Sequence, residues 1–377
     1  MLDSRTLGKR TVYVATPDGY DRTSNRYPVL VLLDADYGVM FRLGIAQAAY
    51  LADNTDHIPS VIVVGIANGA DRIHDMTPVP TGSSVERFRT GGGATAFADF
   101  ILGEVLPAVR SRFRTLPTTL LAGHSAGRLF ALEVAANRPG SFQGVIAADP
   151  AIFYNDGVLA RIYADAIAQS GLPLRLFAAY RGVDITVNDT VFRRFAQRLD
   201  SIKPPHVAFA YRRYADDTHP LVPLSALPDG LRFVFDGVST QHLPIAKLDQ
   251  RADSATLLNA LAASESIYAD SARQLRLPEP LPEPAMNTLA RFALIRLKDP
   301  NLSLLVLRRS VALHPQSAQA LATLADGYLV KGDTASAIAH LRTAIGISQS
   351  SVSPLPDGAR DKLTKLRAGP RPPGTGS

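Results

Sequence analysis

Seven short apolar runs alternate with longer helical patterns through residues 1–236. Several runs are continuous Val, Ile, Leu and Ala, which is typical of strands whose two faces are both covered by helices. This alternation predicts an α/β fold with a mostly parallel central sheet. The predicted strands are TVYVAT (11–16), PVLVLLD (28–34), SVIVVGI (60–66), TTLLAG (118–123), GVIAAD (144–149), LRLFAAY (174–180) and VAFAYRRY (207–214).

The chain of 377 residues is long enough for one large and one small domain, and its 46% apolar fraction can fill a substantial core. The net charge of +6 comes from scattered residues, so we expect an ordinary solvated surface and neither a nucleic-acid nor a membrane partner. The absence of cysteine excludes disulfides, thiolate metal sites and a cysteine nucleophile.

No apolar run reaches the roughly 18 residues that a membrane helix needs. The first ten residues, MLDSRTLGKR, lack the apolar segment of a signal peptide. We therefore expect either a cytoplasmic protein, or a periplasmic or secreted one whose leader has been removed.

The sequence pattern changes near residue 237, beyond which no strand-like apolar run is found. Residues 237–284 are predicted to form a helical, proline-rich linker that ends in PEPLPEP. Residues 285–349 contain two segments that overlay at a 34-residue period and resemble tetratricopeptide repeats, with two helices joined at Gly332-Asp333. We expect this small all-helical domain to pack on the larger one, and either a homo-oligomer or a partner protein is possible through it. Residues 350–377 are predicted to be disordered.

The segment LLAGHSAGRLFAL places Ser125 between a predicted strand and a predicted helix that runs to about Asn137. A serine on such a sharp strand-to-helix turn is held in a strained conformation with its Oγ exposed at the carboxyl edge of the sheet. Gly123 and Gly127 fit this turn because side chains there would collide with the neighbouring strand and helix. The free N–H of Ala126, at the start of the helix, would stabilise an oxyanion. The alternative is a βα loop that glycine merely loosens.

A reactive serine requires a base, and in this architecture the chain order is serine, acid, histidine. Of the five histidines that follow Ser125, His219 is the candidate, because it lies on a loop after the last strand and before a helix. The alternative for His219 is a structural role that holds Asp216 or Asp217. The other four histidines lie at a strand entrance, after the last α/β element or in the repeats: His206, His242, His314 and His340.

The predicted acid is Asp184, four residues beyond the strand LRLFAAY. Asp189 is an alternative that could instead cap the following helix, and Asp216 and Asp217 remain possible. A second oxyanion donor is expected from the loop LLDADYG, where the backbone N–H of Asp36 would lie near the serine.

Several stretches together resemble the putative esterase family of α/β-hydrolases, in its siderophore-esterase-like and esterase D-like branch. They are TLGKRTVYVATPDGY, RYPVLVLLDADY, DRIHDMTP, GGGATAFADFILGEVLPAVRSRF, AGHSAGRLFAL and DDTHPLVPLSALPDGLRFVF, and they cover almost all of residues 5–236. The resemblance implies an α/β-hydrolase fold, nucleophile Ser125, base His219, and oxyanion amides at Asp36 and Ala126. Some members of this branch also carry tetratricopeptide-like C-termini.

The resemblance also suggests that Arg72, Asp75 and Tyr154 border the substrate pocket. Alternatively, Arg72 and Asp75 pair with each other to brace a loop, and Tyr154 belongs to the core. One departure from the family pattern is Arg128, which replaces the second of two usual glycines after the serine. This long cation either selects an acidic substrate or forms a salt bridge pointing outward.

A second departure is Asp34-Ala35, where the family usually has Asp-Gly. The cluster Gly91-Gly92-Gly93 lacks the lysine and the preceding strand of a phosphate-binding loop, so we interpret it as a hinge before the helix 94–113. No metal-ligand spacing and no cofactor fingerprint is found, and no cofactor is expected.

These features predict a serine carboxylic-ester hydrolase acting on a small-molecule ester through Ser125, His219 and Asp184. Two alternatives belong to other classes. One is an acyltransferase of the same fold, in which an alcohol intercepts the acyl-enzyme. The other is a catalytically idle domain that serves as a binding module.

Overall fold

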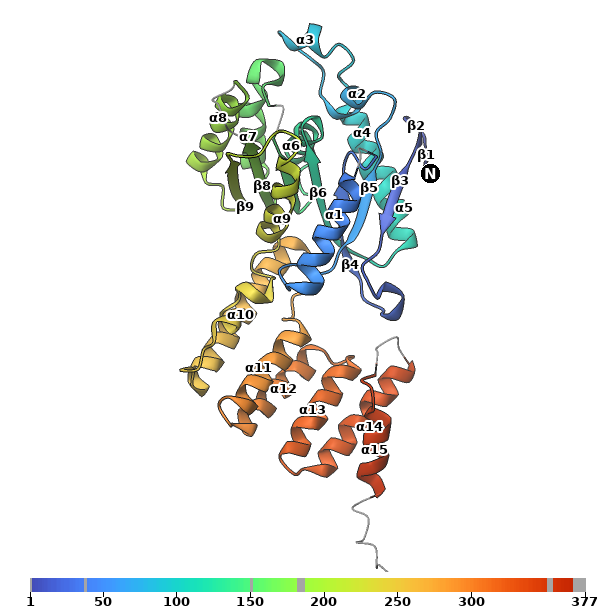
Figure 1. The fold of residues 1–377 in the computed structure, drawn as a ribbon, viewed down its shortest axis with the longest axis vertical. Helices are drawn as coiled ribbons and strands as arrows, with labels where there is room; N and C mark the ends of the chain where they lie inside the picture. The colour runs from blue at the N-terminus through green and yellow to red at the C-terminus, as the bar shows by residue number, and fades with distance from the viewer. Residues whose placement is uncertain (1, 37–38, 150–151, 182–186, 351–354, 369–377) are drawn as a thin grey trace, which may run out of the picture. The chain divides into compact units, whose positions relative to one another are not determined.

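A computed structural model of the chain describes residues 2–36, 39–149, 152–181, 187–350 and 355–368 (Figure 1). The chain divides into two compact units. The first unit comprises Met1–Asp18, Arg26–Ser239 and Ser271–Leu277, and the second comprises Gly19–Asn25, Thr240–Asp270 and Pro278–Ser377. Over the described residues, no helix combines the length and apolar character that crossing a bilayer needs.

The first unit is built on a seven-stranded sheet with the order β3-β5-β4-β6-β7-β8-β9. Only β3 runs antiparallel to its neighbour, and all the other neighbouring pairs are parallel. This arrangement confirms the predicted α/β class with its mostly parallel sheet. The strands are β3 (Val12–Ala15), β4 (Tyr27–Leu32), β5 (Ile62–Ile66), β6 (Thr115–His124), β7 (Gly144–Ala148), β8 (Leu174–Arg181) and β9 (Val207–Tyr214).

Helices flank the sheet and leave its central strands fully buried, as their apolar sequences require (Figure 1). Helix α6 packs on β6 and β7, whereas α9 packs on β7 and β8 and also contacts α1. Glycine allows a close approach at β7, because a Cβ on Gly144 would lie 2.5 Å from a methyl group of Val234 on α9. The helices longer than eight residues are α1 (Met40–Ala49), α6 (Ala126–Asn137), α7 (Leu159–Gln169), α8 (Val187–Ile202) and α9 (Val222–Val234).

The helix predicted at 94–113 starts directly after the glycine cluster but is not a single α-helix. It consists of α4 (Ala94–Phe100), a π-helical segment (Ile101–Val105) and α5 (Leu106–Arg112). Pro107 is the second residue of α5, and a proline inside a helix removes one N–H donor and clashes with the carbonyl four residues earlier. The interruption of regular α-helix before this proline follows from that clash.

Several short elements complete the first unit. An antiparallel pair that the sequence analysis did not predict, β1 (Leu2–Ser4) with β2 (Gly8–Arg10), precedes the large sheet. The others are a π-helical segment (Tyr50–Asn54), α2 (Arg72–Met76), α3 (Ser84–Arg87) and a 3₁₀ turn (Tyr154–Gly157).

The second unit is helical throughout its described residues. Helix α13 ends at Val330 and α14 begins at Thr334, so the turn falls at Gly332-Asp333 as predicted, with Gly332 at φ 77°. The main helices are α10 (Ser254–Leu275), whose last residues belong to the first unit, α11 (Glu283–Ile295), α12 (Pro300–Leu313), α13 (Ala318–Val330), α14 (Thr334–Ser350) and α15 (Ala359–Ala368). Short 3₁₀ turns occur at Tyr20–Arg22, Thr240–His242 and Pro244–Lys247.

The prediction that residues 350–377 are disordered is wrong over α15. Ala359 and Leu363 are buried in a cluster with Leu341 and Ala344 of α14, and Leu366 packs against the same cluster. These three residues of α15 are spaced at i, i+4 and i+7, which gives one apolar stripe on an otherwise polar helix. Because charged and polar residues outnumber the apolar residues of this narrow stripe, the composition of the segment suggested disorder.

Candidate active site

Ser125 lies at the turn where β6 ends at His124 and α6 begins at Ala126. Its backbone has φ 59° and ψ −117°, a region that costs a non-glycine residue about 1–3 kcal/mol. The Ser125 N–H donates to the Ala148 carbonyl at 3.2 Å, which fixes the turn against β7. A Cβ on Gly123 would lie 2.3 Å from the Gly127 carbonyl oxygen, so only glycine at position 123 permits this tight turn.

His219 lies on the loop between β9 and α9, and the side chain is 37% exposed. Its Nδ1 is hydrogen-bonded to Oδ2 of Asp149. Because a carboxylate only accepts, Nδ1 carries the proton and Nε2 keeps its lone pair in the neutral ring. Ser125 and His219 line the same pocket, although no hydrogen bond joins them among the described residues. Contacts of this kind commonly tighten only when substrate binds.

Asp149 follows β7 directly, with φ 58°, and its N–H donates to the Ala179 carbonyl at 2.8 Å. Its side chain is 1% exposed and also forms an ion pair with Nε of Arg181 at 3.2 Å. Burial alone would raise the pKa of Asp149, but the hydrogen bond from His219 and the charges of Arg128 and Arg181 together hold it below its usual value. Asp149 is therefore a buried carboxylate kept ionised beside an imidazole.

Asp149 was not among the predicted partners of His219. The predicted acid Asp184 lies outside the described residues, as does the side chain of Asp189 on α8. The position expected for Asp184, at Nδ1 of His219, is occupied by Asp149. The signal in the sequence is that Asp149 ends the run GVIAAD, a position it shares with other acids after strands; the pairing of β7 with β6, which brings it beside the serine turn, is seen in the fold.

Arg128, on the first turn of α6, is fully buried and is absent from the pocket lining. Its guanidinium carbon lies 5.7 Å from the ring centroid of Phe192. Among the described residues, none of its three side-chain nitrogens has a hydrogen-bond partner. Neither interpretation from the sequence, selection of an acidic substrate or an outward salt bridge, fits this position. Its charge instead acts on Asp149, whose pKa it helps to lower.

Arg72 lines the pocket and braces the loops around Ser125. Its Nε and Nη2 both donate to the Asp34 carboxylate, the latter at 2.8 Å, and Nη2 also donates to the His124 carbonyl at 3.0 Å. Asp34, which has φ 61°, is thereby tied to the strand that carries the serine. The Asp36 carboxylate accepts from both the backbone and the side-chain nitrogen of Asn68 and is not part of the pocket lining.

Asp75 and Tyr154, predicted to border the pocket, are buried elsewhere. Asp75 forms an ion pair with Nη2 of Arg10 at 3.0 Å and does not pair with Arg72. Tyr154 is fully buried, and its hydroxyl donates to the Pro78 carbonyl at 2.9 Å. Neither side chain lines the pocket, so the structural alternative describes Tyr154 correctly, and the pairing of Asp75 with Arg72 is replaced by an ion pair with Arg10.

His124 precedes the serine in the chain and contacts the proposed base, His219. Its Nε2 donates to the His219 carbonyl at 2.9 Å, and the two imidazole rings are 4.3 Å apart. Burial and the neighbouring His219 lower the pKa of His124 to about 4, so His124 is neutral near pH 7. Ligand atoms of His124, Asp149 and His219 all lie within 4.8 Å of one another and could together hold a metal ion. The sequence has no metal-ligand spacing at these positions, because the three residues come together only in the fold.

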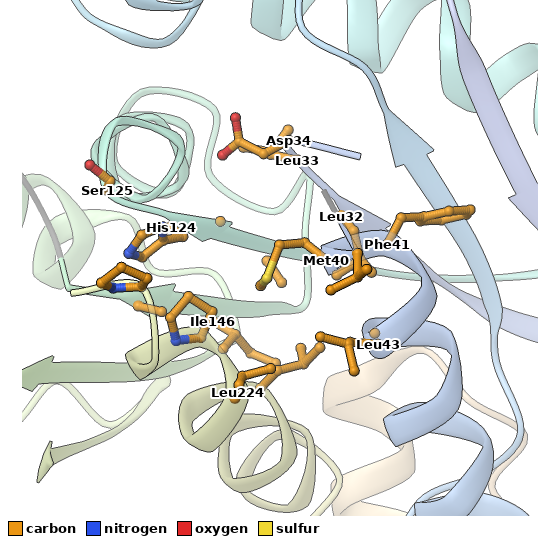
Figure 2. A pocket seen from close by; sticks show the side chains of 18 of the residues that line it. Leu32, Leu33, Asp34, Met40, Phe41, Leu43, His124, Ser125, Ile146 and Leu224 are labelled. Carbon is orange, nitrogen blue, oxygen red and sulfur yellow. The ribbon is translucent and has the colours of Figure 1, made fainter. Parts of the chain in front are cut away.

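The pocket has a volume of about 450 Å³, which is within the usual range for small-molecule sites. Ser125, His124 and Asp34 lie toward one end, and Leu43 and Leu224 lie toward the other (Figure 2). The polar lining residues are Asp34, Gln47, Arg72, His124, Ser125 and His219; the others are Leu32, Leu33, Val39, Met40, Phe41, Leu43, Gly44, Ala122, Gly123, Ile146, Ala148, Pro220, Pro223, Leu224 and Leu227.

Comparison with known families shows that residues 4–157 match the family described as "Putative esterase". Among curated proteins, the chain is 32% identical over 146 residues to a siderophore triacetylfusarinine C esterase of Aspergillus fumigatus, covering 36% of this chain and 48% of that protein. It is also 32% identical over 144 residues to the ferri-bacillibactin esterase BesA of Bacillus subtilis, covering 34% and 49%. The chain thus spans about half the length of the curated relatives it matches.

Among solved structures, an IroE-like serine hydrolase from Shewanella oneidensis superposes with a TM-score of 0.66 at 23% identity, covering 82% of this chain and 98% of that one. A protein from Capnocytophaga ochracea superposes with a TM-score of 0.65 at 16% identity, covering 97% and 98%. At these identities the likeness is one of fold, and the serine-hydrolase neighbour confirms the α/β-hydrolase fold.

Proposed function

We propose that the protein, whose residues 4–157 match the putative esterase family, is a serine carboxylic-ester hydrolase with Ser125 as nucleophile, His219 as base and Asp149 as acid. The observation that carries the proposal is the buried hydrogen bond from His219 to Asp149, in the same pocket as a strained serine turn. The names of the curated relatives, both siderophore esterases, support ester hydrolysis as the reaction class.

The proposed reaction has two stages. In the first, Ser125 Oγ attacks the ester carbonyl while Nε2 of His219 takes its proton, and the same proton is then given to the departing alcohol. In the second, His219 activates water, which attacks the acyl-enzyme and releases the acid. Asp149 keeps the proton of His219 on Nδ1 and stabilises the imidazolium that forms in each stage.

Two backbone donors are proposed for the oxyanion. One is the N–H of Ala126, which at the start of α6 has no acceptor within the helix and lies at the positive end of the helix dipole. The other belongs to the turn after β4, where the sequence predicts the Asp36 amide and where Asp34 lines the pocket. The bond network from Arg72 to Asp34 and the His124 carbonyl would hold this turn against the serine.

The test of this proposal is the Ser125→Ala variant. We expect it to lower kcat/KM for p-nitrophenyl acetate by about 10⁴-fold and to abolish labelling by a fluorophosphonate probe. Ser201→Ala, which changes an exposed serine on α8, is the matched control and should leave both readouts unchanged. Activity and labelling that survive in Ser125→Ala would refute the assignment of the nucleophile.

The apolar pocket also supports a second candidate, acyl transfer to an alcohol, because a lining poor in polar groups disfavours water. Adding an alcohol or a sugar to the assay and analysing the products distinguishes the two. A transferase forms the new ester in preference to the free acid.

For the helical unit we propose a tetratricopeptide-like role in binding a partner protein or a second copy of this chain, on the basis of its antiparallel pairs α11/α12 and α13/α14. Light scattering on the full chain tests self-association. A monomeric mass at all protein concentrations would contradict the homo-oligomer.

A further inference from the structure

The pocket beside Ser125 is divided into a polar and an apolar half. Ser125, His124 and Asp34 lie at one end, whereas Met40, Ile146, Leu43 and Leu224 lie toward the other (Figure 2). The apolar half is formed between α1, α9 and the strands β4 and β7. It therefore extends from the nucleophile along α1 and α9.

The apolar half offers a ligand almost no hydrogen-bonding capacity. Its polar side chain, Gln47 of α1, already donates its amide N–H to the Leu224 carbonyl of α9 at 2.8 Å. The bond ties together the two helices that enclose the space. Apart from the remaining amide atoms of Gln47, a polar group that entered here would find no side-chain partner to replace its hydration, whereas a hydrocarbon would gain from the burial.

We infer that the substrate is an ester whose acyl group is an unbranched aliphatic chain, and that this chain occupies the apolar half of the pocket. The inference rests on the proposed function and adds the substrate class to it. Such a substrate differs in chemistry from the siderophores for which the curated relatives are named.

The acyl side of the ester is assigned to this half because of the order of events in the two-stage reaction. When Ser125 Oγ bonds to the carbonyl carbon, the bond from that carbon to the alcohol oxygen breaks, and the alcohol takes the proton of His219. The alcohol must then leave and water must enter, so the alcohol side needs the path to solvent. The acyl group remains covalently bound until water releases it, and an apolar space next to the nucleophile suits the group that stays.

The first experiment measures kcat/KM for p-nitrophenyl esters of acetic, butanoic, hexanoic and octanoic acid. We expect a rise of about threefold for each added methylene up to hexanoyl, as the burial of a CH₂ group predicts. A matched ester series with an acetyl group and lengthening alcohols should rise much less. A flat or falling acyl series, or a better rate with a catechol siderophore lactone, would overturn the inference.

The second experiment fills the apolar half of the pocket with Leu43→Trp, a change on a half-buried position of α1. We expect the ratio of kcat/KM for octanoyl over acetyl ester to fall by about tenfold or more, because the longer side chain takes the volume of several methylenes. Ile162→Trp, at a 48% exposed position of α7 outside the pocket, is the control and should keep the wild-type ratio. An unchanged ratio in Leu43→Trp would mean that the acyl chain does not occupy the apolar half of the pocket.

A binding measurement separates this inference from the proposed function and does not depend on turnover. Decanoate should raise the melting temperature of the folded Ser125→Ala protein, and acetate at the same concentration should not. If wild-type Ser125 reacts with a fluorophosphonate but decanoate gives no shift, the acyl-chain inference fails and the esterase proposal stands. If decanoate binds but Ser125 is neither labelled nor required for hydrolysis, the esterase proposal fails.

Discussion

Asp149 and His219 lie 70 positions apart in the chain, yet the buried carboxylate of the first is hydrogen-bonded to Nδ1 of the second. The strand β7 delivers Asp149 to the carboxyl edge of the sheet, and the loop before α9 folds His219 back over it. This pair fixes the tautomer that a general base at Nε2 requires.

Replacement of Asp149 by asparagine should lower kcat for p-nitrophenyl acetate by about 10³- to 10⁴-fold. The amide is nearly isosteric with the carboxylate, but it can donate to Nδ1 and so favours the wrong tautomer, and it cannot stabilise the imidazolium. Steady-state kinetics on protein with an unchanged circular dichroism spectrum provides the measurement.

Asp184→Asn and Asp189→Asn serve as controls for that variant. Because Asp149 already occupies the position at Nδ1, both should retain activity within a few-fold of wild type. A loss in Asp184→Asn that exceeds the loss in Asp149→Asn would return the acid to the position that the sequence analysis assigned.

Arg128→Met should raise the stability of the protein and lower its activity at acid pH. The guanidinium is buried without a hydrogen-bond partner among the described residues, so a methionine of similar length should raise the free energy of unfolding by about 1–3 kcal/mol. The same change removes a charge that lowers the pKa of Asp149, so the acid limb of the kcat profile should move to higher pH. Urea denaturation and a pH–rate profile measure the two effects, with exposed Arg194→Met as the control. A less stable Arg128→Met protein with an unshifted profile would contradict both parts.

The sequence predicted the parts of the site that depend on local pattern. The strand, the serine and the helix are contiguous, so the turn at Ser125 could be located from residues 118–137 alone. Asp149 could not be distinguished from other acids after strands, because its role depends on the neighbouring strand and on a loop 70 residues away. Arg128 was misplaced for a related reason: a charged side chain suggests exposure, and only the fold shows that it is fully buried with its guanidinium over the ring of Phe192 on α8.

His124 should make the protein sensitive to acid. The pKa of His124 is about 4 in the folded protein and about 6.5 in an unfolded chain. As the pH falls between these values, the unfolded chain binds a proton that the folded protein does not, so the free energy of unfolding decreases. Between about pH 7.5 and about pH 5, wild type should lose roughly 2 kcal/mol more stability than His124→Gln. Urea denaturation of both proteins at the two pH values checks this, and equal losses would show that His124 titrates normally in the folded state.

Gly123 and Gly127, the two glycines of the serine turn, should differ in how much stability is lost when each is replaced by alanine. A Cβ at position 123 meets the Gly127 backbone at 2.3 Å, whereas one at position 127 meets only side-chain atoms, the nearest at 3.2 Å from Asp34 Oδ2. Gly123→Ala should therefore cost about 3 kcal/mol of stability and Gly127→Ala about 1 kcal/mol, because backbone cannot give way as side chains can. Thermal unfolding ranks them, and the reverse order would mean that the turn has another geometry.

Leu363→Ala tests whether α15 is part of the folded helical unit. Leu363 is 8% exposed and packs in the cluster that contains Leu341 and Ala344 of α14. Its truncation should cost about 2–3 kcal/mol of local stability and speed hydrogen exchange of the amides in α14. Exchange is the better readout here, because a chain of two units need not unfold in one transition. Lys365→Ala, at an exposed position of the same helix, should leave exchange in α14 unchanged. If both variants behave like wild type, the segment does not pack on α14, and the disorder predicted from its composition describes it correctly.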